Sequence, residues 1–298
     1  MIDFKPITLE ARRELLPFLG RKHHSACYQS FATMYLWSGI YQTQYCLTGE
    51  FMFTRNGSGG YSFPYGDGDL KEGIALLRQD AADNGKELWF FGLLEEQKAW
   101  LEQNYPGEFT YTASRDDAEY IYEAEKLATY AGKKLHGKRN FCNRFEAAHP
   151  DWKFERITAE NREAVLEFHR QWCAANEGSD EGLHKEGCVV RCALRHLDEL
   201  EMTGGVLTAG GKIYGFAVAS MINETIMDEN IEKADGEEPG AYPMVCREMT
   251  RMMMERYPDL TLVNREEDTG DEGLRRSKLS YYPVMLLEKY VTKEQKKP

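Results

Sequence analysis

The sequence predicts an α/β (α+β) protein of two similar halves, each a mixed sheet flanked by helices. Three observations carry this prediction. The chain has 298 residues, enough for two domains of ordinary size. The chain matches itself when it is aligned at an offset of 150 residues. The expected helices and strands also follow the same order in both halves.

The internal match begins with Phe4 and Phe154 and covers fifteen positions. Seven of these are identical, at positions 4, 7, 8, 10, 12, 16 and 18 and their counterparts 150 residues later. Two amphipathic helix starts, each capped by a threonine, would give a similar match by coincidence. We interpret the match as an internal repeat. It predicts domains 1–150 and 151–298, joined near His149, Pro150 and Asp151, since a proline there suits a linker.

Hydrophobic patterns place the elements of each half. After its first helices, the first half should contain a hairpin (45–53, then 61–63), a helix (70–82), a strand (87–91), a helix (95–103) and a strand (118–122). The second half should contain a hairpin (205–209 with 212–221), a strand (224–233), a helix (242–256), a strand (260–264), a helix (272–279) and a strand (284–288). On helix 242–256, Val245, Met249, Met252 and Met253 share one apolar face, which predicts core packing.

Composition narrows the function classes. No apolar run approaches the roughly 20 residues that cross a bilayer, and the N-terminus lacks a signal-peptide pattern, so we expect a cytoplasmic protein without membrane insertion. The seven scattered cysteines contain no CxxC pair, which predicts reduced thiols and no metal site. The net charge of −12 disfavours nonspecific binding to nucleic acid. However, the stretch 127–145 carries five basic residues and no acid.

Four segments make the sequence similar to a known family. They are Tyr120–Tyr122, Lys133–Phe145, Asn264–Asp271 and Gly273–Pro283. Together they resemble the phosphatidylglycerol lysyltransferase C-terminal domain family, over nearly the whole chain. The resemblance implies a tandem GNAT-like fold, related to enzymes that pass an amino acid from aminoacyl-tRNA to a lipid or peptide. The membrane enzymes of this kind join the domain to a long transmembrane region. Because this chain has no similar stretch, we do not expect a lipid acceptor.

The resemblance also directs attention to the donor. GNAT acetyltransferases hold the coenzyme A pyrophosphate on backbone amides where a loop opens a helix. The matching place here is 235–242, where Gly240, Ala241 and Tyr242 are candidate donor-binding residues. Glu237 and Glu238 would repel a phosphate there, which weakens acyl-CoA as the donor without excluding it. The first half matches this loop less well at 65–70, so we expect that half to be catalytically silent.

The densest group of candidate catalytic residues follows the strand 260–264. Acyl transfer to an amine needs a base, a group that stabilises the oxyanion, and positioning groups. We predict Glu266, Asp268 and Tyr281 as catalytic, with substrate or donor binding by Asn264, Glu267, Arg275 and Lys278. Adjacent carboxylates suit a cationic amine, and basic residues at i and i+3 suit an acyl oxygen or phosphate. The alternative is a solvated acidic loop paired with its basic neighbours.

A further candidate base lies on the strand 224–233. Strict alternation would place Ile226, Asp228, Asn230 and Glu232 on one face. GNAT enzymes often use a carboxylate on this strand, which makes Glu232 a catalytic candidate. Its alternative is an exposed edge residue.

The basic stretch supplies the remaining candidates. Lys138 and Arg139 would hold a phosphate of tRNA or coenzyme A in the cleft between the halves, with Asn140 and Asn143 beside them. Alternatively, the two asparagines satisfy backbone groups. The resulting hypothesis is an acyl or aminoacyl transferase that uses acyl-CoA or aminoacyl-tRNA, with a small-molecule amine or hydroxyl acceptor and no metal. The competing hypothesis is a noncatalytic module that binds a small charged metabolite.

Overall fold

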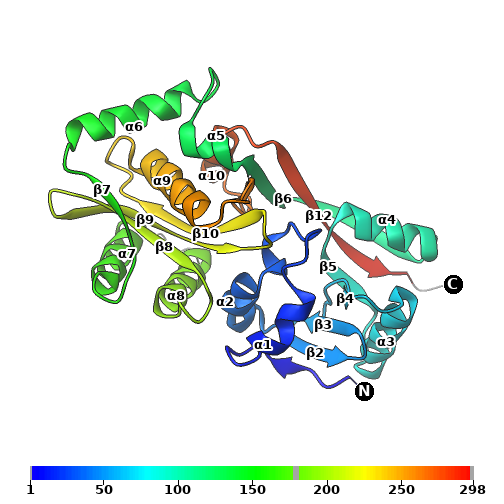
Figure 1. Cartoon of the computed structure of the whole chain (residues 1–298). Helices are drawn as coiled ribbons and strands as arrows, with labels where there is room; N and C mark the ends of the chain where they lie inside the picture. The colour runs from blue at the N-terminus through cyan, green and yellow to red at the C-terminus, as the bar shows by residue number, and fades with distance from the viewer. Residues whose placement is uncertain (1, 177–180, 296–298) are drawn as a thin grey trace.

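The computed structural model describes residues 2–176 and 181–295, and two sheets organise these residues (Figure 1). The larger sheet has the strand order β5-β12-β6-β11-β10-β9-β8-β7. Its strands are β5 (Trp89–Leu93), β6 (Phe109–Glu123), β7 (Lys153–Arg156), β8 (Thr203–Ala209), β9 (Lys212–Met221), β10 (Ile226–Ala234), β11 (Leu262–Asn264) and β12 (Met285–Glu294). Among the strand pairs that the structure describes in this sheet, β10 and β11 are parallel and the others are antiparallel. The sheet is therefore mixed, as predicted.

The smaller sheet belongs to the first half and has the order β1-β2-β3-β4. Its strands are β1 (Lys5–Pro6), β2 (Gln44–Thr48), β3 (Phe51–Arg55) and β4 (Tyr65–Gly66). The predicted pairing of a strand over 45–53 with one over 61–63 is wrong: Tyr61 forms isolated bridges to Arg55 and Phe90, and the segment 45–53 turns back on itself at Gly49 and Glu50. The hairpin of the structure is the antiparallel pair β2 and β3, in which Cys46 lies opposite Phe53. Its residues are largely buried because this sheet packs under helix α3 and the strand β5.

Helices cover the sheets on both faces. They are α1 (Arg12–Leu15), α2 (Phe31–Tyr41), α3 (Leu70–Asp83), α4 (Glu95–Asn104), α5 (Ala124–Thr129), α6 (His136–Ala148), α7 (Arg162–Asn176), α8 (Glu181–Arg195), α9 (Ala241–Arg256) and α10 (Glu272–Leu279), with short 3-10 helices η1 (Leu16–Phe18) and η2 (Cys27–Gln29). Figure 1 shows α9 and α6 on one face of strands β7 to β10, with α7 and α8 on the other. The bounds predicted for α10 agree with the structure, since Asp271 caps its first turn.

Two strands are longer than the sequence pattern predicts. β6 begins at Phe109 rather than near residue 118, and β12 continues to Glu294 rather than ending near residue 288. The additional residues pair with one another, from Lys289 opposite Ser114 to Glu294 opposite Phe109. Most side chains of the added β6 segment are exposed and polar, so they form no hydrophobic run. Backbone pairing across the chain, rather than local propensity, makes them strands.

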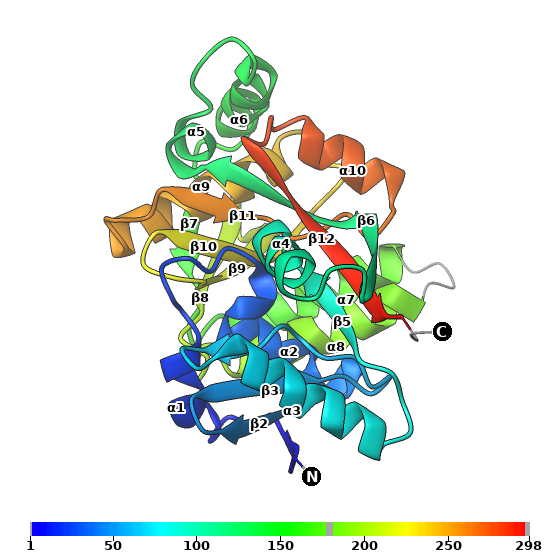
Figure 2. The same ribbon diagram turned by 90° about the vertical axis from the view of Figure 1, so that its right-hand side faces the viewer.

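The position of β12 joins the two halves. This last strand lies between β5 and β6, which come from the first half (Figure 2). One hydrophobic cluster also combines Leu15 and Phe31 of the first half with Val190 and Phe216 of the second. The predicted join at 149–151 falls between α6 and β7. The division into domains 1–150 and 151–298 stays a prediction.

The methionine face of α9 is a core surface, as predicted. Val245, Met249 and Met253 are buried in one cluster with strands β8 to β10, and Met252 is partly buried. All seven cysteines are free thiols. Across residues 2–176 and 181–295, no helix combines the length and the apolar character that a membrane crossing requires.

Candidate functional site

A pocket of about 330 Å³ lies where η2 and α2 face the strands β5, β6 and β12. One wall is aromatic and includes Tyr28, Trp37, Tyr41, Phe91 and Tyr290. The lining also contains the four charged side chains of Asp117, Glu266, Glu267 and Lys289. Thus the pocket combines residues from both halves of the chain, and three of its four charged side chains are acidic.

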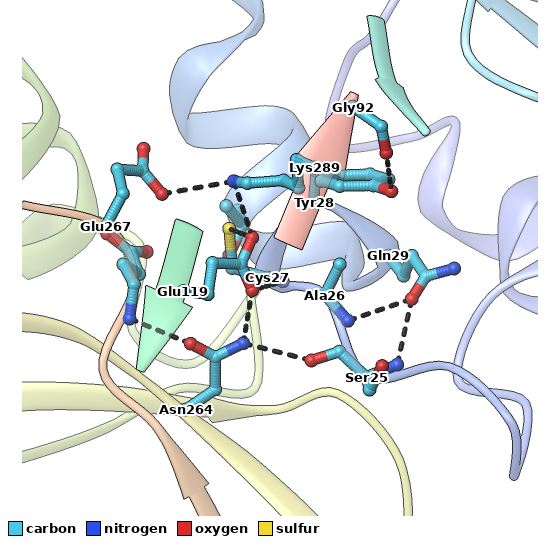
Figure 3. Close-up of polar contacts among 12 residues, drawn as sticks. Ser25, Ala26, Cys27, Tyr28, Gln29, Gly92, Glu119, Asn264, Glu267 and Lys289 are labelled. Carbon is cyan, nitrogen blue, oxygen red and sulfur yellow. Dashed lines mark hydrogen bonds and ion pairs between the residues drawn. The ribbon is translucent and has the colours of Figure 1, made fainter. Parts of the chain in front are cut away.

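Glu119 organises the floor beneath this pocket (Figure 3). Its fully buried carboxylate accepts hydrogen bonds from the backbone N of Cys27 at 3.0 Å and from Nζ of Lys289 at 2.7 Å. The thiol of Cys27, at 3.1 Å, and the amide of Asn264 donate to it as well. Burial opposes ionisation, but Lys289 and the other donors hold the pKa of Glu119 below its usual value. Glu119 is therefore an ionised anchor, already satisfied by four donors.

The donors to Glu119 also fix the surrounding chain. The amide of Asn264 donates a second hydrogen bond to the carbonyl of Ser25 at 2.9 Å, and its Oδ1 accepts from the backbone N of Glu266 at 2.8 Å. Lys289 lies 3.3 Å from Glu267, and its pKa is raised despite burial because Glu119 and Glu267 flank it. These contacts hold the loop before η2 and the segment after β11 on opposite sides of one carboxylate.

Two further carboxyl groups, those of Asp228 and Glu266, lie beside Cys27. Asp228 is fully buried, and its Oδ2 accepts from the hydroxyl of Thr33 at 2.7 Å and from the amide of Asn230 at 2.8 Å. Its Oδ1, like the buried Oε1 of Glu266, has no hydrogen-bond partner among the described residues. Oxygens of these two carboxyls and the Sγ of Cys27 all lie within 4.8 Å of one another. Burial raises the pKa of both Asp228 and Glu266 well above the ordinary value, and for Glu266 the charge of Asp228 adds to it.

A bulge in β10 places Asp228 and Glu232 on different faces of the strand. The pairing of β10 with β9 shifts between Asp228 and Ile231. As a result, Asp228 and Asn230 face Thr33, whereas Glu229 and Glu232 both bind Arg265. The expectation of one continuous face from Ile226 to Glu232 is therefore wrong. A bulge adds a residue and reverses the alternation beyond it.

Three predicted residues form a packed cluster around Arg265, outside the pocket lining. Glu232 pairs with the Arg265 guanidinium, and the buried ring of Tyr281 lies 4.7 Å from it. Lys138 also lies over the ring of Tyr281, with Nζ 3.7 Å from the ring centroid. Burial, together with the nearby Arg265, lowers the pKa of Lys138 to about 8. Glu232, Tyr281 and Lys138 therefore lie together in one cluster. Their side chains contact Arg265 and one another, and they do not belong to the pocket lining.

Asp268 and Arg275 form a third cluster. The buried carboxylate of Asp268 accepts from Arg275 at 2.7 and 2.9 Å and from Arg115 at 3.1 Å, and the hydroxyl of Tyr120 donates to it. Although burial opposes ionisation, Arg275 and Tyr120 hold the pKa of Asp268 far below its usual range. Lys278 donates to the carbonyls of Arg265 at 2.6 Å and Glu267 at 2.5 Å. This cluster thereby fixes the backbone that presents Glu266 and Glu267.

Helix α6 packs against the start of α9, but the predicted donor-binding residues of α6 contact other parts of the chain. Arg139 donates to the carbonyl of Tyr130 at 2.5 Å, Asn140 lies 3.3 Å from the ring of His136, and Asn143 is exposed. Gly240 caps α9 with φ 98°, and a Cβ there would lie 2.4 Å from the carbonyl oxygen of Phe141. Ala241 is fully buried, and Tyr242 is partly buried. Thus α6 covers the N-terminus of α9.

Of the fifteen predicted site residues, Glu266 and Glu267 line the pocket and Asn264 supports it. Sequence reasoning missed Cys27, Thr33, Glu119 and Lys289, and it named Asp228 only as a member of a strand face. Glu119 directly precedes the Tyr120–Tyr122 segment, and this was the one available signal. A single charged residue inside an otherwise ordinary segment does not reveal its distant partner.

Solved structures with a similar fold were compared with the chain. A conserved protein of unknown function from Bacteroides thetaiotaomicron has 36% identity and a TM-score of 0.94, with 99% of this chain and 100% of the other covered. The C-terminal domain of a candidate lysylphosphatidylglycerol synthetase from Agrobacterium fabrum has 12% identity and a TM-score of 0.66, covering 97% and 92%. FemX has 10% identity and a TM-score of 0.65, covering 99% and 98%. The two distant likenesses show the fold alone, and the predicted α/β class, with sheets flanked by helices, is confirmed.

Sequence comparison gives the family. An uncharacterised protein of Mycoplasmoides gallisepticum is 25% identical over 215 residues, which is 71% of this chain, and the match spans 66% of that relative. The model of the family described as "Phosphatidylglycerol lysyltransferase, C-terminal" matches residues 20–293. The match includes all four segments that carried the resemblance and every residue of the pocket. The chain therefore belongs to the phosphatidylglycerol lysyltransferase C-terminal family.

Proposed function

We propose that the protein is an aminoacyl transferase whose pocket holds the ammonium-bearing part of an aminoacyl group. Family and fold indicate an acyl or aminoacyl transferase. The observation that favours the aminoacyl choice is Glu266, which lines the pocket and whose buried Oε1 has no partner among the described residues. An unsatisfied buried carboxyl oxygen is costly unless a ligand group completes it.

The charge of the pocket supports a cationic ligand. Its lining contains Asp117, Glu266 and Glu267 against the single cation Lys289, and Lys289 is already shared between Glu119 and Glu267. An acetyl or fatty acyl group carries no charge that would use these carboxylates. The aromatic wall adds faces over which an ammonium is attracted.

The N-terminus of α9 supports the same choice of donor. The pyrophosphate of coenzyme A would need backbone amides there, and the chain places α6 against Gly240 instead. Glu238 next to it also pairs with His149 at 3.2 Å. Both features disfavour acyl-CoA and leave aminoacyl-tRNA as the proposed donor, with an amine or hydroxyl acceptor.

The proposed chemistry assigns roles to pocket residues. The acceptor N or O attacks the ester carbonyl carbon, the bond to the ribose oxygen breaks, and the acceptor proton passes through a carboxyl to that leaving oxygen. Glu266 is the proposed proton carrier, because it lines the pocket and burial raises its pKa. Lys289, whose pKa is raised by Glu119 and Glu267, stays cationic and is the proposed donor to the developing oxyanion. Glu119 positions Lys289.

A ligand series tests this proposal. Amino-acid amides carry the ammonium and carbonyl of an aminoacyl group without tRNA, and we expect at least one to bind and raise the melting temperature. At about 100 times its dissociation constant, a ligand adds roughly 2.7 kcal/mol of stability. Glu266→Gln should weaken binding at least 10-fold, and the exposed Glu72→Gln should not. We expect no shift with acetyl-CoA.

Three outcomes would count against the proposal. Stabilisation by acyl-CoA but by no amide would favour a conventional acyltransferase. If no ligand of the series raised the melting temperature, the ammonium pocket would be refuted. Binding without transfer from a mixture of charged tRNAs to amine or hydroxyl acceptors would support the noncatalytic module. Binding of charged tRNA itself should fall steeply with salt, since several phosphates would be contacted.

A further inference from the structure

Asp228 and Glu266 form a carboxyl pair that is distinct from the ionised anchor Glu119. Each has an oxygen without a partner among the described residues, and their oxygens lie within 4.8 Å of each other and of the Cys27 thiol. Asp228 is fully buried behind the pocket, whereas Glu266 belongs to the pocket lining. One carboxyl thus faces the ligand, and the other lies behind it.

We propose that this pair holds a proton in the free protein and releases it when an ammonium group enters the pocket beside Glu266. The pocket would take up its cationic ligand by exchanging it for a proton. The inference rests on the proposed function, because it requires that the pocket bind an ammonium. It goes further by naming the group that makes binding depend on pH.

The surroundings explain why the proton stays in the free protein. Around the pair, Glu119 on β6 and Glu267 after β11 contribute negative charge, while Lys289 on β12 and Lys278 on α10 contribute positive charge. From η2, Cys27 contributes a thiol whose own pKa burial raises. Thr33 of α2 and Asn230 of β10 donate to Asp228 but carry no charge.

Neither lysine is available to neutralise the pair. Lys289 contacts Glu119 and Glu267, and Lys278 donates to two backbone carbonyls. Two adjacent carboxyls without a dedicated cation cannot both ionise in a buried site, so at least one retains a proton. An ammonium placed against Glu266 supplies the missing cation, so the pair no longer needs its proton.

The exchange makes the affinity for the ammonium ligand change with pH in one direction. Between the pKa of the pair in the free protein and its lower pKa in the complex, each bound ammonium displaces protons. Affinity should therefore rise with pH in that interval, up to the point at which the ligand amine itself loses its proton. After the exchange Glu266 is ionised beside the ligand, which is the form that could accept a proton during transfer.

Calorimetry with the most tightly binding amino-acid amide tests the exchange. Titrations at pH 6.5 in buffers of different ionisation enthalpy give the number of protons released per ligand bound. At this pH an α-amino group, with a pKa near 8, is almost fully protonated and contributes little. We expect the wild-type protein to release about one proton per ligand, because one carboxyl of the pair should ionise.

Variants separate the pair from other sources of protons. In Asp228→Asn the charge behind Glu266 is lost, Glu266 ionises more readily in the free protein, and we expect fewer protons released with binding retained. Glu72→Gln is the matched control and should behave like the wild type. Circular dichroism and melting temperature report whether each variant folds. If a variant does not fold, proton release by the wild-type protein still tests the exchange.

The results distinguish the two proposals. If no amide binds, the proposed function fails. If an amide binds, and Glu266→Gln weakens it, but no proton is released at pH 6.5, the exchange is overturned while the ammonium pocket stands. Unchanged proton release in Asp228→Asn would also overturn the assignment to this pair.

Discussion

At the scale of single residues, Asp268 and Asp228 show how two buried aspartates acquire opposite properties. Asp268 has Arg115, Arg275 and Tyr120 as partners, and its pKa falls. Among the residues that the structure describes, the donors to Asp228 are the neutral side chains of Thr33 and Asn230, and burial raises its pKa. The partners, rather than burial alone, decide the protonation state. Asp268 is consequently an anchor of the loop, and Asp228 is the group available for proton exchange.

This difference changes what should follow from substitution at Asp268. Asp268→Ala would leave Tyr120 and Arg275 without their buried partner, and we expect a loss of about 3–5 kcal/mol in unfolding free energy. Its depressed pKa means that its stabilisation is present above the unfolded pKa near 3.9 and is lost as pH falls toward the folded pKa. Urea denaturation at pH 7 measures the first effect, and its comparison with denaturation at pH 3, inside the interval in which the stabilisation is lost, measures the second.

Asp116 provides the matched control for Asp268. It also binds Arg275, at 2.6 Å, but its side chain is 60% exposed. Asp116→Ala should cost less than about 1 kcal/mol, since exposed ion pairs contribute little. Equal losses for the two variants would contradict the anchor role of Asp268.

At the scale of elements, the contact between α6 and the start of α9 decides whether the second half offers an anion site. Gly240 is required there for two reasons: its φ is 98°, and a Cβ would collide with the Phe141 carbonyl. We expect Gly240→Ala to lower stability by about 1–3 kcal/mol. In contrast, Gly236→Ala should have little effect, because Gly236 is exposed and a Cβ there meets nothing within 4 Å. Thermal denaturation of the two variants, compared with the wild type, measures the difference; similar melting temperatures would refute the close contact.

At the scale of the whole molecule, the two halves depend on each other. β12 of the second half lies between β5 and β6, and one hydrophobic cluster combines side chains of both halves. We expect the fragments 1–150 and 151–298, expressed separately, to lack cooperative unfolding transitions. Mixing or co-expressing them should restore folded protein, as judged by circular dichroism. If either fragment unfolds cooperatively by itself, the shared sheet is less important than its topology indicates.

Much of the architecture follows from the sequence by local rules. Periodic apolar residues and caps located α3, α4, α9 and α10, and the alternating runs located the β8–β9 hairpin. The acidic segment 264–268 was also visible, because a strand followed by charged residues is a local pattern. These features depend on neighbours in the chain, so one sequence suffices to find them.

The tertiary structure alone decided which residues form the site. It joined Cys27, Glu119, Asp228, Glu266 and Lys289 from five separate segments around one pocket, and the bulge in β10 turned Glu232 away from the face that carries Asp228. It also separated Asp268 and Tyr281 from the pocket into packed clusters. The physical reason is that a carboxyl group's partners, and with them its protonation state, are set by contacts between residues more than 100 positions apart in the chain, which local patterns do not encode.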